Sequence, residues 1–331
     1  MNRHHRPLLL AAALVAALGV LAATATATAG QKAAVPAPSK VTIAYQPGIG
    51  YAPLIVLKTQ HTLEAQFPNT TFSWKVLSSG AAITNGIISG DVQIGAGGVG
   101  PLIVAWAAGV DLKIVAPLDW GDLWLMAKDP AIKTIADLKG KKIAMPGPTS
   151  IQGVVLRKMA QVKLGDAHAL DSSIISMDHP IAMQALLTGQ IDAHLTSAPY
   201  QLQEKVHGAH IVARSYQYFG AHSFLDAWET TAFYNQYPQF SKAFYTDVSQ
   251  AIDLINKNPA KASRILQDDS GGIPTWRQYK QWIASSGLKF TTQPLGLMRF
   301  ANFMSKIGMI NKMPATWTDL VLQPVFGTKG S

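Results

Sequence analysis

Residues 78–120 read SSGAAITNGIISGDVQIGAGGVGPLIVAWAAGVDLKIVAPLDW. Two glycine-rich turns in this stretch each precede an apolar run of helical length. The expected order is turn, helix, strand, turn, helix and strand, at 78–80, 81–89, 92–95, 95–100, 101–108 and 112–117. Helices that alternate with short strands predict a parallel sheet with crossover helices. Helix N-termini at such turns favour a negative or strongly polar group placed above them.

The second turn also matches a nucleotide-binding pattern. Gly95, Gly97 and Gly100 have the G-x-G-x-x-G spacing, with Gly98 between them, and Asp119 follows about twenty residues later. This pattern makes a dinucleotide such as NAD one possible ligand. The helix after it is short for a dinucleotide-binding unit, and the N-terminus predicts export away from the nicotinamide pool. NAD binding is therefore kept as an alternative, ranked below the interpretation that follows.

The N-terminus has the features of a cleavable signal peptide, assigned to residues 1–29. A basic start precedes an apolar run over 8–23, and small A-x-A sites place cleavage after Ala27 or Ala29. The chain has no cysteine, which excludes disulfides, thiolate metal sites, a cysteine nucleophile and a lipid-modified N-terminal cysteine. Together these features predict a protein of the bacterial periplasm.

The charge of the chain is positive but diffuse. The formal net charge is +9, only 14% of residues are charged, and no dense basic run occurs. Nucleic-acid-binding proteins cluster lysine and arginine on one face, so no nucleic-acid partner is expected. A diffuse positive field attracts small anions instead.

The rest of the chain continues the alternation and then becomes helical. A first β/α unit runs from about residue 41 to 117, and a second from about 123 to 213. The first includes a helix expected over 53–67. The second includes a short helix expected over 134–142, which stops at Gly140, and helices expected over 151–164 and 200–206. From residue 224 onward strand signals fade. Helices are expected there at 238–256, 259–267, 275–285 and 294–307.

Five segments, in order, resemble one family. The substrate-binding proteins of ABC importers for sulfonates, taurine and nitrate, together with the NMT1-like binders of thiamine pyrimidines, have similar segments. In this chain they are 51–58, 86–95, 108–116, 135–144 and 187–193. The resemblance implies a two-lobed α/β periplasmic-binding-protein (Venus-flytrap) fold, type II-like, with a mainly parallel sheet flanked by helices in each lobe. It places lobe one at 38–120 and 222–331 and lobe two at 121–221, with the ligand cleft between them.

Turns at the carboxyl ends of strands are expected to line this cleft. They nominate eleven ligand-binding candidates: Gln46, Tyr51, Ser79, Gly80, Gly98, Val99, Trp120, Thr149, Ser150, His194 and Ser197. Each has a structural alternative: a helix N-cap for the hydroxyl residues, turn chemistry for Gln46 and Tyr51, and ordinary packing for Trp120 and His194. His222, Trp124 and Trp228 are weaker candidates.

The expected function is binding without catalysis. The sequence has no H-E-x-x-H, G-x-S-x-G or phosphate-loop lysine motif, so no metal, cofactor or catalytic residue is predicted. The resemblance implies a monomer that captures a small organic anion and delivers it to an ABC permease. A neutral or heteroaromatic ligand, such as a thiamine pyrimidine precursor, is the alternative. A periplasmic enzyme using Asp119 and His194 ranks lower.

Overall fold

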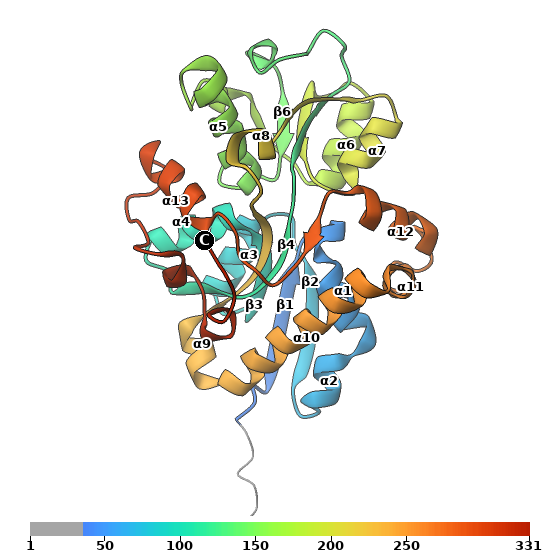
Figure 1. The fold of residues 1–331 in the computed structure, drawn as a ribbon, viewed down its shortest axis with the longest axis vertical. Coiled ribbons are helices and arrows are strands. Elements are labelled where there is room, and N and C mark those ends of the chain that lie inside the picture. Colours follow the sequence, from blue (N-terminus) through green and yellow to red (C-terminus); the bar gives the residue numbers. More distant parts are fainter. Residues whose placement is uncertain (1–35) are drawn as a thin grey trace, which may run out of the picture. The chain divides into compact units, whose positions relative to one another are not determined.

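Two β-sheets organise the protein in a computed structural model that describes residues 36–331 (Figure 1). The predicted signal peptide at 1–29 lies outside the described residues. The first sheet has the strand order β11-β4-β10-β3-β1-β2. Its strands are β1 (Lys40–Tyr45), β2 (Thr71–Val76), β3 (Ile94–Gly98), β4 (Leu112–Trp120), β10 (Ser223–Thr230) and β11 (Lys289–Phe290).

The second sheet has the strand order β7-β6-β8-β5-β9. Its strands are β5 (Trp124–Ala127), β6 (Ile143–Met145), β7 (Ile174–Ser176), β8 (Ala193–Thr196) and β9 (His210–Arg214). Both sheets therefore share one pattern, in which a strand that enters from the other sheet lies between two strands of the sheet. Strand β10 lies between β3 and β4, and β5 lies between β8 and β9. These inserted strands, β5 and β10, run antiparallel to their neighbours, whereas β1 pairs in parallel with β2 and β3, and β6 with β7 and β8. Each sheet is thus a parallel half joined to an antiparallel half.

Helices follow most strands and pack on the two sheets (Figure 1). Around the first sheet they are α1 (Ala52–Gln60), α2 (Thr62–Gln66), α3 (Gly80–Ile88), α4 (Val99–Ala107), α9 (Thr231–Gln236), α10 (Pro238–Lys257), α11 (Pro259–Asp269), α12 (Trp276–Ser285) and α13 (Leu297–Lys306). In the second they are α5 (Ile151–Leu164), α6 (His179–Leu187), α7 (Tyr200–Val206) and α8 (Tyr216–Phe219). The long helix α10 buries Phe240, Phe244, Val248 and Ile255, a helical spacing that gives it one apolar face.

Three expected elements differ from the structure. The absence of strands after residue 224 is wrong, because β10 lies in the middle of the first sheet. Strand β10 escaped prediction because it carries Asp226 and Glu229, residue types that seldom occupy buried strands. The single helix expected over 53–67 is broken at His61, whose left-handed φ of 51° ends α1. The expected helix at 134–142 is only a 3₁₀ turn at Ala136–Leu138.

Two segments of the chain connect the sheets, one between β4 and β5 and the other between β9 and β10, and they are hydrogen-bonded to each other. The first leads from β4 to β5 and contains Asp122, whose carboxylate accepts from Arg214 Nε at 2.5 Å and from the Tyr216 N–H at 3.1 Å. The Ser215 hydroxyl accepts from the Leu123 N–H at 2.9 Å. Because these crossings are tied together, we propose them as the hinge between the predicted lobes, 38–120 with 222–331 and 121–221.

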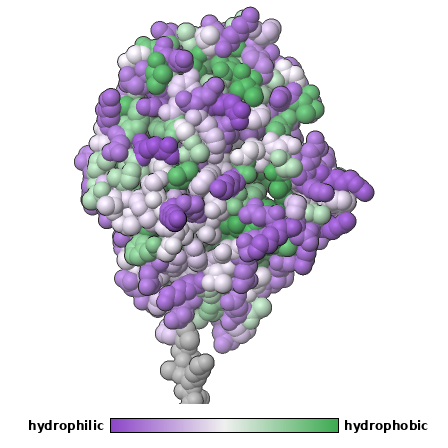
Figure 2. Space-filling view, viewed as in Figure 1, coloured by the Kyte–Doolittle hydropathy of each residue, from purple (hydrophilic) through white to green (hydrophobic). Residues whose placement is uncertain are grey.

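The surface is largely polar. Figure 2 shows hydrophilic side chains over much of the viewed face, with apolar patches between them. Among residues 36–331, no helix combines the length and apolarity that a membrane crossing requires.

The buried acid in β10 predicts a pH-dependent stability. Burial raises the pKa of Glu229 to about 8, so the folded protein keeps a proton that the unfolded chain releases. The free energy of unfolding should therefore fall as the pH rises from about 4.5 to about 8. Glu229→Gln should flatten this loss and stabilise the protein at pH 8 by roughly 1–4 kcal/mol, measured by urea unfolding. The control Asp253→Asn, at an exposed position on α10, should leave the pH profile unchanged; an equally steep profile in Glu229→Gln would contradict the prediction.

Candidate ligand-binding site

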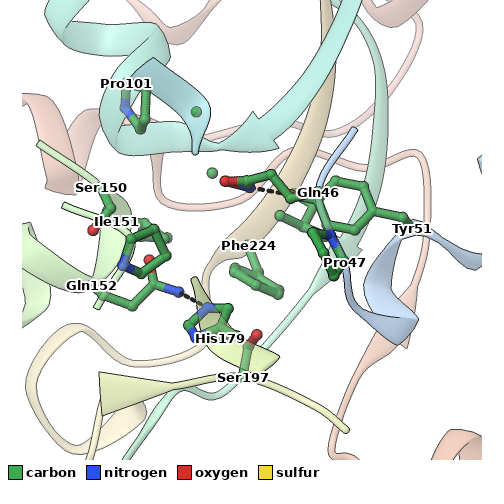
Figure 3. Close-up of a pocket in the computed structure, with 14 residues that line it drawn as sticks. Gln46, Pro47, Tyr51, Pro101, Ser150, Ile151, Gln152, His179, Ser197 and Phe224 are labelled. Carbon is green, nitrogen blue, oxygen red and sulfur yellow. Dashed lines mark hydrogen bonds between the residues drawn. The ribbon is translucent and has the colours of Figure 1, made fainter. Parts of the chain in front are cut away.

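A small cavity lies between the two sheets (Figure 3). On one side lie residues of β3 and β10 and residues that follow β1, β2 and β3, and on the other side lie residues that follow β6, β7 and β8. Its free space is about 20 Å³, which is about enough for a single ordered water. An adjoining hollow of about 350 Å³ shares Gly80, Pro101, Pro146 and Ser150 with it. A ligand of several atoms would therefore require the two sides to separate.

Eight of the eleven sequence candidates line these two spaces. The cavity is lined by Gln46, Tyr51, Gly80, Gly98, Ser150 and Ser197. Ser79 and Thr149 line the adjoining hollow. Whether any of them contacts a ligand stays a prediction.

The other three candidates lie elsewhere. Val99 is fully buried in the main hydrophobic core. Trp120 donates its indole N–H to the Gln293 carbonyl at 2.6 Å, and the Lys289 ammonium lies 4.2 Å from its ring centroid. These contacts arise because β11 pairs with the end of β4, a pairing that the sequence did not predict. His194 is fully buried in β8, behind His179.

The weaker candidates have structural partners. His222 is fully buried between the Ser215 hydroxyl and the Ser223 carbonyl. Trp228 is fully buried in the main core, and the Arg214 guanidinium stacks 5.2 Å from the Trp124 ring centroid. None of the three lines the cavity.

Four helix N-termini converge on the cavity. The lining residues include the first residue of α3, Gly80, the residue before α4, Gly98, and the first residues of α5 and α6, Ile151 and His179. The first N–H groups of a helix have no carbonyl partner within it, and they carry the positive end of the helix dipole. No Asp, Glu, Lys or Arg occurs among the lining residues. The electrostatic character of the cavity therefore comes from the backbone.

The serine hydroxyls at these termini serve as helix caps. Ser79 Oγ accepts from the Ala82 N–H at 3.1 Å at the start of α3. Ser150 Oγ accepts from the Gly153 N–H at 3.1 Å at the start of α5, and its own proton goes to the Gly147 carbonyl at 2.6 Å. The N-cap alternative is confirmed for both serines, so their hydroxyls hold the helices in place while the backbone N–H groups remain available.

The sequence missed several lining residues, above all Gln152 and His179. Gln152 is the second residue of α5, and His179 is the first of α6. The rule that nominated the other strand-to-helix turns applies equally to the turn between β7 and α6, so it could have identified His179. Phe224 and Leu225 also line the cavity, but they belong to β10, which the sequence analysis did not predict.

The glycine pattern has a structural explanation. Strand β3 extends from Ile94 to Gly98 and α4 follows directly, so Gly95 and Gly97 lie in a strand and no glycine-rich loop forms. A Cβ on Gly95 would meet Ile83 at 2.2 Å, which explains that glycine by packing within the first sheet. This geometry removes the main support for the dinucleotide alternative.

Gly98 and Gly100 allow the two sides of the cavity to touch. A Cβ on Gly98 would lie 2.7 Å from the Ile151 side chain. A Cβ on Gly100 would lie 2.8 Å from the Thr149 carbonyl oxygen and 2.9 Å from the Ile151 nitrogen. Because these neighbours are mainly backbone, they cannot move aside as a flexible side chain would.

The two residues of the enzyme alternative are not brought together at the cavity. Asp119 is fully buried and accepts from the Leu225 N–H at 3.1 Å, whereas His194 hydrogen-bonds to His179 and Glu204. Burial, reinforced by the nearby Asp226, raises the pKa of Asp119 well above its usual range. Neither side chain lines the cavity. Over residues 36–331, no group of His, Cys, Asp and Glu has a metal-binding arrangement.

The close contact at Gly100 predicts that adding one methyl group there separates the two sides of the cavity. Gly100→Ala should force 149–151 away from α4, which overpacking data put at roughly 1–3 kcal/mol of stability. Small-angle scattering should show an expanded ligand-free protein, and thermal unfolding a lower Tm. The control Gly86→Ala puts its methyl group against Val92, within the first-sheet side of the molecule. Identical scattering profiles for both variants would contradict the prediction.

Comparisons with known proteins bear on the family and the fold of the chain. The profile of a family described as NMT1/THI5 like matches residues 77–262, more than half of the 331 residues. An Escherichia coli K12 protein named for binding aliphatic sulfonates is 30% identical over 190 residues, covering 56% of this chain and 56% of that protein. The match thus spans little more than half of that relative. The taurine-binding periplasmic protein of the same organism is 28% identical over 249 residues, covering 71% of this chain and 75% of that protein.

A solved structure shares the fold of this chain. The alkanesulfonate-binding protein SsuA from Xanthomonas axonopodis pv. citri, bound to MOPS, aligns with a TM-score of 0.68 at 21% identity, covering 89% of this chain and 99% of that one. The expected periplasmic-binding-protein fold is confirmed by this likeness. The family match and the fold agree, and the chain belongs to the NMT1/THI5-like family.

Proposed function

We propose that this protein is a solute-binding protein of the bacterial periplasm that captures a small organic anion, of the sulfonate, taurine or nitrate class. It would then deliver this anion to the membrane permease of an ABC importer. The named specificities of the relatives support this class of ligand. The signal-peptide pattern at 1–29 supports export, and a monomer suffices because the chain itself supplies both sides of the cavity.

The observation that carries the proposal is the convergence of four helix N-termini on a cavity without charged side chains. Backbone N–H groups at helix N-termini bind sulfate, phosphate and carboxylate groups in many proteins. Each terminus contributes a partial positive charge, so the four together can balance a small anion without a charged side chain.

A neutral heteroaromatic ligand is the second candidate. The side chains of Gln46 and Gln152 reach the cavity from opposite sides, with the Phe224 ring between them (Figure 3). Amide groups pair with the ring nitrogens of a pyrimidine, and a phenyl ring packs against its face. This arrangement supports a thiamine pyrimidine precursor, although it leaves the four helix termini without a charge to bind.

A thermal-shift screen tests the proposal. The panel contains taurine, alkyl and aryl sulfonates, nitrate, bicarbonate, aromatic carboxylates, hydroxymethylpyrimidine and NAD. A ligand at about one hundred times its Kd should add roughly 2.7 kcal/mol to the free energy of unfolding. Stabilisation by one class of anion, with the ligand recovered unchanged, is the expected result. Stabilisation by hydroxymethylpyrimidine alone would favour the second candidate, and stabilisation by NAD alone or turnover of the ligand would contradict binding without catalysis.

Two helix-cap variants test whether the anion binds at the cavity. Ser150→Ala removes the cap of α5 at the cavity, and Thr230→Ala removes the equivalent cap of α9, where Thr230 Oγ1 accepts from the Phe233 N–H. Each should cost roughly 0.5–2 kcal/mol of stability. Only Ser150→Ala should also weaken anion binding, measured by calorimetry. Equal affinities in the two variants would place the anion elsewhere.

A further inference from the structure

A line of buried polar side chains leads from the cavity into the second sheet. Gln152 Nε2 lies 3.1 Å from His179 Nε2, and His179 Nδ1 lies 2.8 Å from His194 Nε2. His194 Nδ1 in turn is hydrogen-bonded to Glu204 Oε1. Figure 3 shows the cavity end of this line, where Gln152 and His179 meet. We call these four residues the Gln152–Glu204 relay.

The relay is isolated from solvent, and the half-buried Asp178 directly precedes His179 in the chain. Gln152 and His179 are 3% and 8% exposed, and His194 and Glu204 are fully buried. The Tyr200 ring stacks on His179, with ring centroids 5.7 Å apart. On the neighbouring strand β9, Arg214 is paired with Asp122, and His210 bonds the Ile132 carbonyl. Within residues 36–331, His194 is the only residue that forms a hydrogen bond or ion pair with the Glu204 carboxyl group.

Glu204 is favoured in its protonated form by this environment. One of its oxygens, Oε2, is buried without a hydrogen-bond partner in the described part of the chain, and a carboxylate there would be strongly destabilised. Burial raises the pKa of Glu204 to about 9 and lowers that of His194 to about 3. Burial and the adjacent His194 hold the pKa of His179 well below its usual range. The directions of these three pKa shifts favour the neutral form of all three side chains at pH 7.

In a neutral relay all the hydrogen bonds run in the same donor-to-acceptor direction. A neutral imidazole has one donor nitrogen and one acceptor nitrogen, so the state of one end of the relay fixes the other. If Glu204 carries a proton, it donates to His194 Nδ1. His194 Nε2–H then donates to His179 Nδ1, and His179 Nε2–H donates to the Gln152 carbonyl. In the structure Gln152 Nε2 faces His179, so this direction requires the amide to turn over, which brings its NH₂ group to face the cavity.

The reverse direction would give the cavity the opposite polarity. Removing the Glu204 proton to solvent moves each ring proton from Nε2 to Nδ1. The Gln152 amide then donates its NH₂ group to His179 and turns its carbonyl oxygen toward the cavity. A carbonyl oxygen repels an anion, whereas an NH₂ group binds one.

We propose that Glu204, acting through His194 and His179, is a positioning residue whose proton turns the Gln152 NH₂ group toward the cavity and so makes the site selective for an anion. The ligand class rests on the proposed function, but the direction of the relay does not. The two can therefore fail separately.

The direct test is the tautomer of each histidine, which requires no ligand. Long-range ¹H–¹⁵N spectra of the ¹⁵N-histidine-labelled protein at pH 7 distinguish the two ring nitrogens, and His179→Asn and His194→Asn assign the signals. The expected result is that His179 and His194 are both neutral Nε2–H tautomers. Two Nδ1–H tautomers, two different tautomers, or a charged ring would overturn the proposal.

Binding of the anion found in the screen tests the consequence. Glu204→Gln keeps a donor for His194 and should leave the affinity within about threefold, whereas Glu204→Leu should lower it about tenfold, the effect of one lost hydrogen bond. Gln152→Met should cause the same loss, and Gln161→Met, on the same helix but bonded to the Gly165 carbonyl, should cause none. Equal affinities for Glu204→Leu and Glu204→Gln would overturn the role of Glu204. If the screen finds no anion, the proposed function fails while the tautomers still decide the relay.

Discussion

The contact between the backbone at Gly100 and the backbone at 149–151 is the constraint on which the site depends. It joins the start of α4, which follows a strand of the first sheet, to the start of α5, which follows a strand of the second. Only a residue without a Cβ permits this approach. The same contact brings helix N-termini from both sheets to one cavity, so a ligand can be held by both sides at once. The hydrogen-bonded crossings at Asp122 and Ser215 join the two sheets at a second place, which is the hinge proposed above.

The electrostatic potential of the cavity is set mainly by backbone groups and neutral side chains. The cavity has no charged side chain, and its positive character comes from helix termini. Asp119 and Asp226, which lie beside the lining residue Leu225, are fully buried with raised pKa values. Asp178, which lines the adjoining hollow directly before His179, is half-buried, and burial raises its pKa as well. Each raised pKa lessens the negative charge close to the site that is proposed to receive an anion. The relay follows the same logic, since a neutral Glu204 acts on the cavity only through the orientation of an amide.

The sequence predicted much of the fold because alternation of apolar runs with glycine-rich turns is a local signal. Helix α5 at Ile151–Leu164 and helix α7 at Tyr200–Val206 are confirmed with the expected bounds. Strand β10 was missed because its stability comes from neighbours distant in sequence, which bury Asp226 and Glu229 against expectation. The site residues divide in the same way, into those with a local sequence signal and those placed by strands distant in sequence. Turn residues such as Gly80 and Ser150 could be nominated from their local pattern, whereas Phe224 reaches the cavity only through the pairing of β10, and the direction of Trp120 depends on β11.

The central claim is that the ligand binds between two sides that move relative to each other, and a distance across the cavity tests it most directly. The chain has no cysteine, so spin labels can be attached at Asp129→Cys and Lys242→Cys, two exposed positions on opposite sides of the cavity. We predict a broad distribution of label-to-label distances in the free protein and a narrower, shorter one with saturating anion. An unchanged distribution, with binding confirmed in the same sample, would contradict the claim that the two sides close on the ligand.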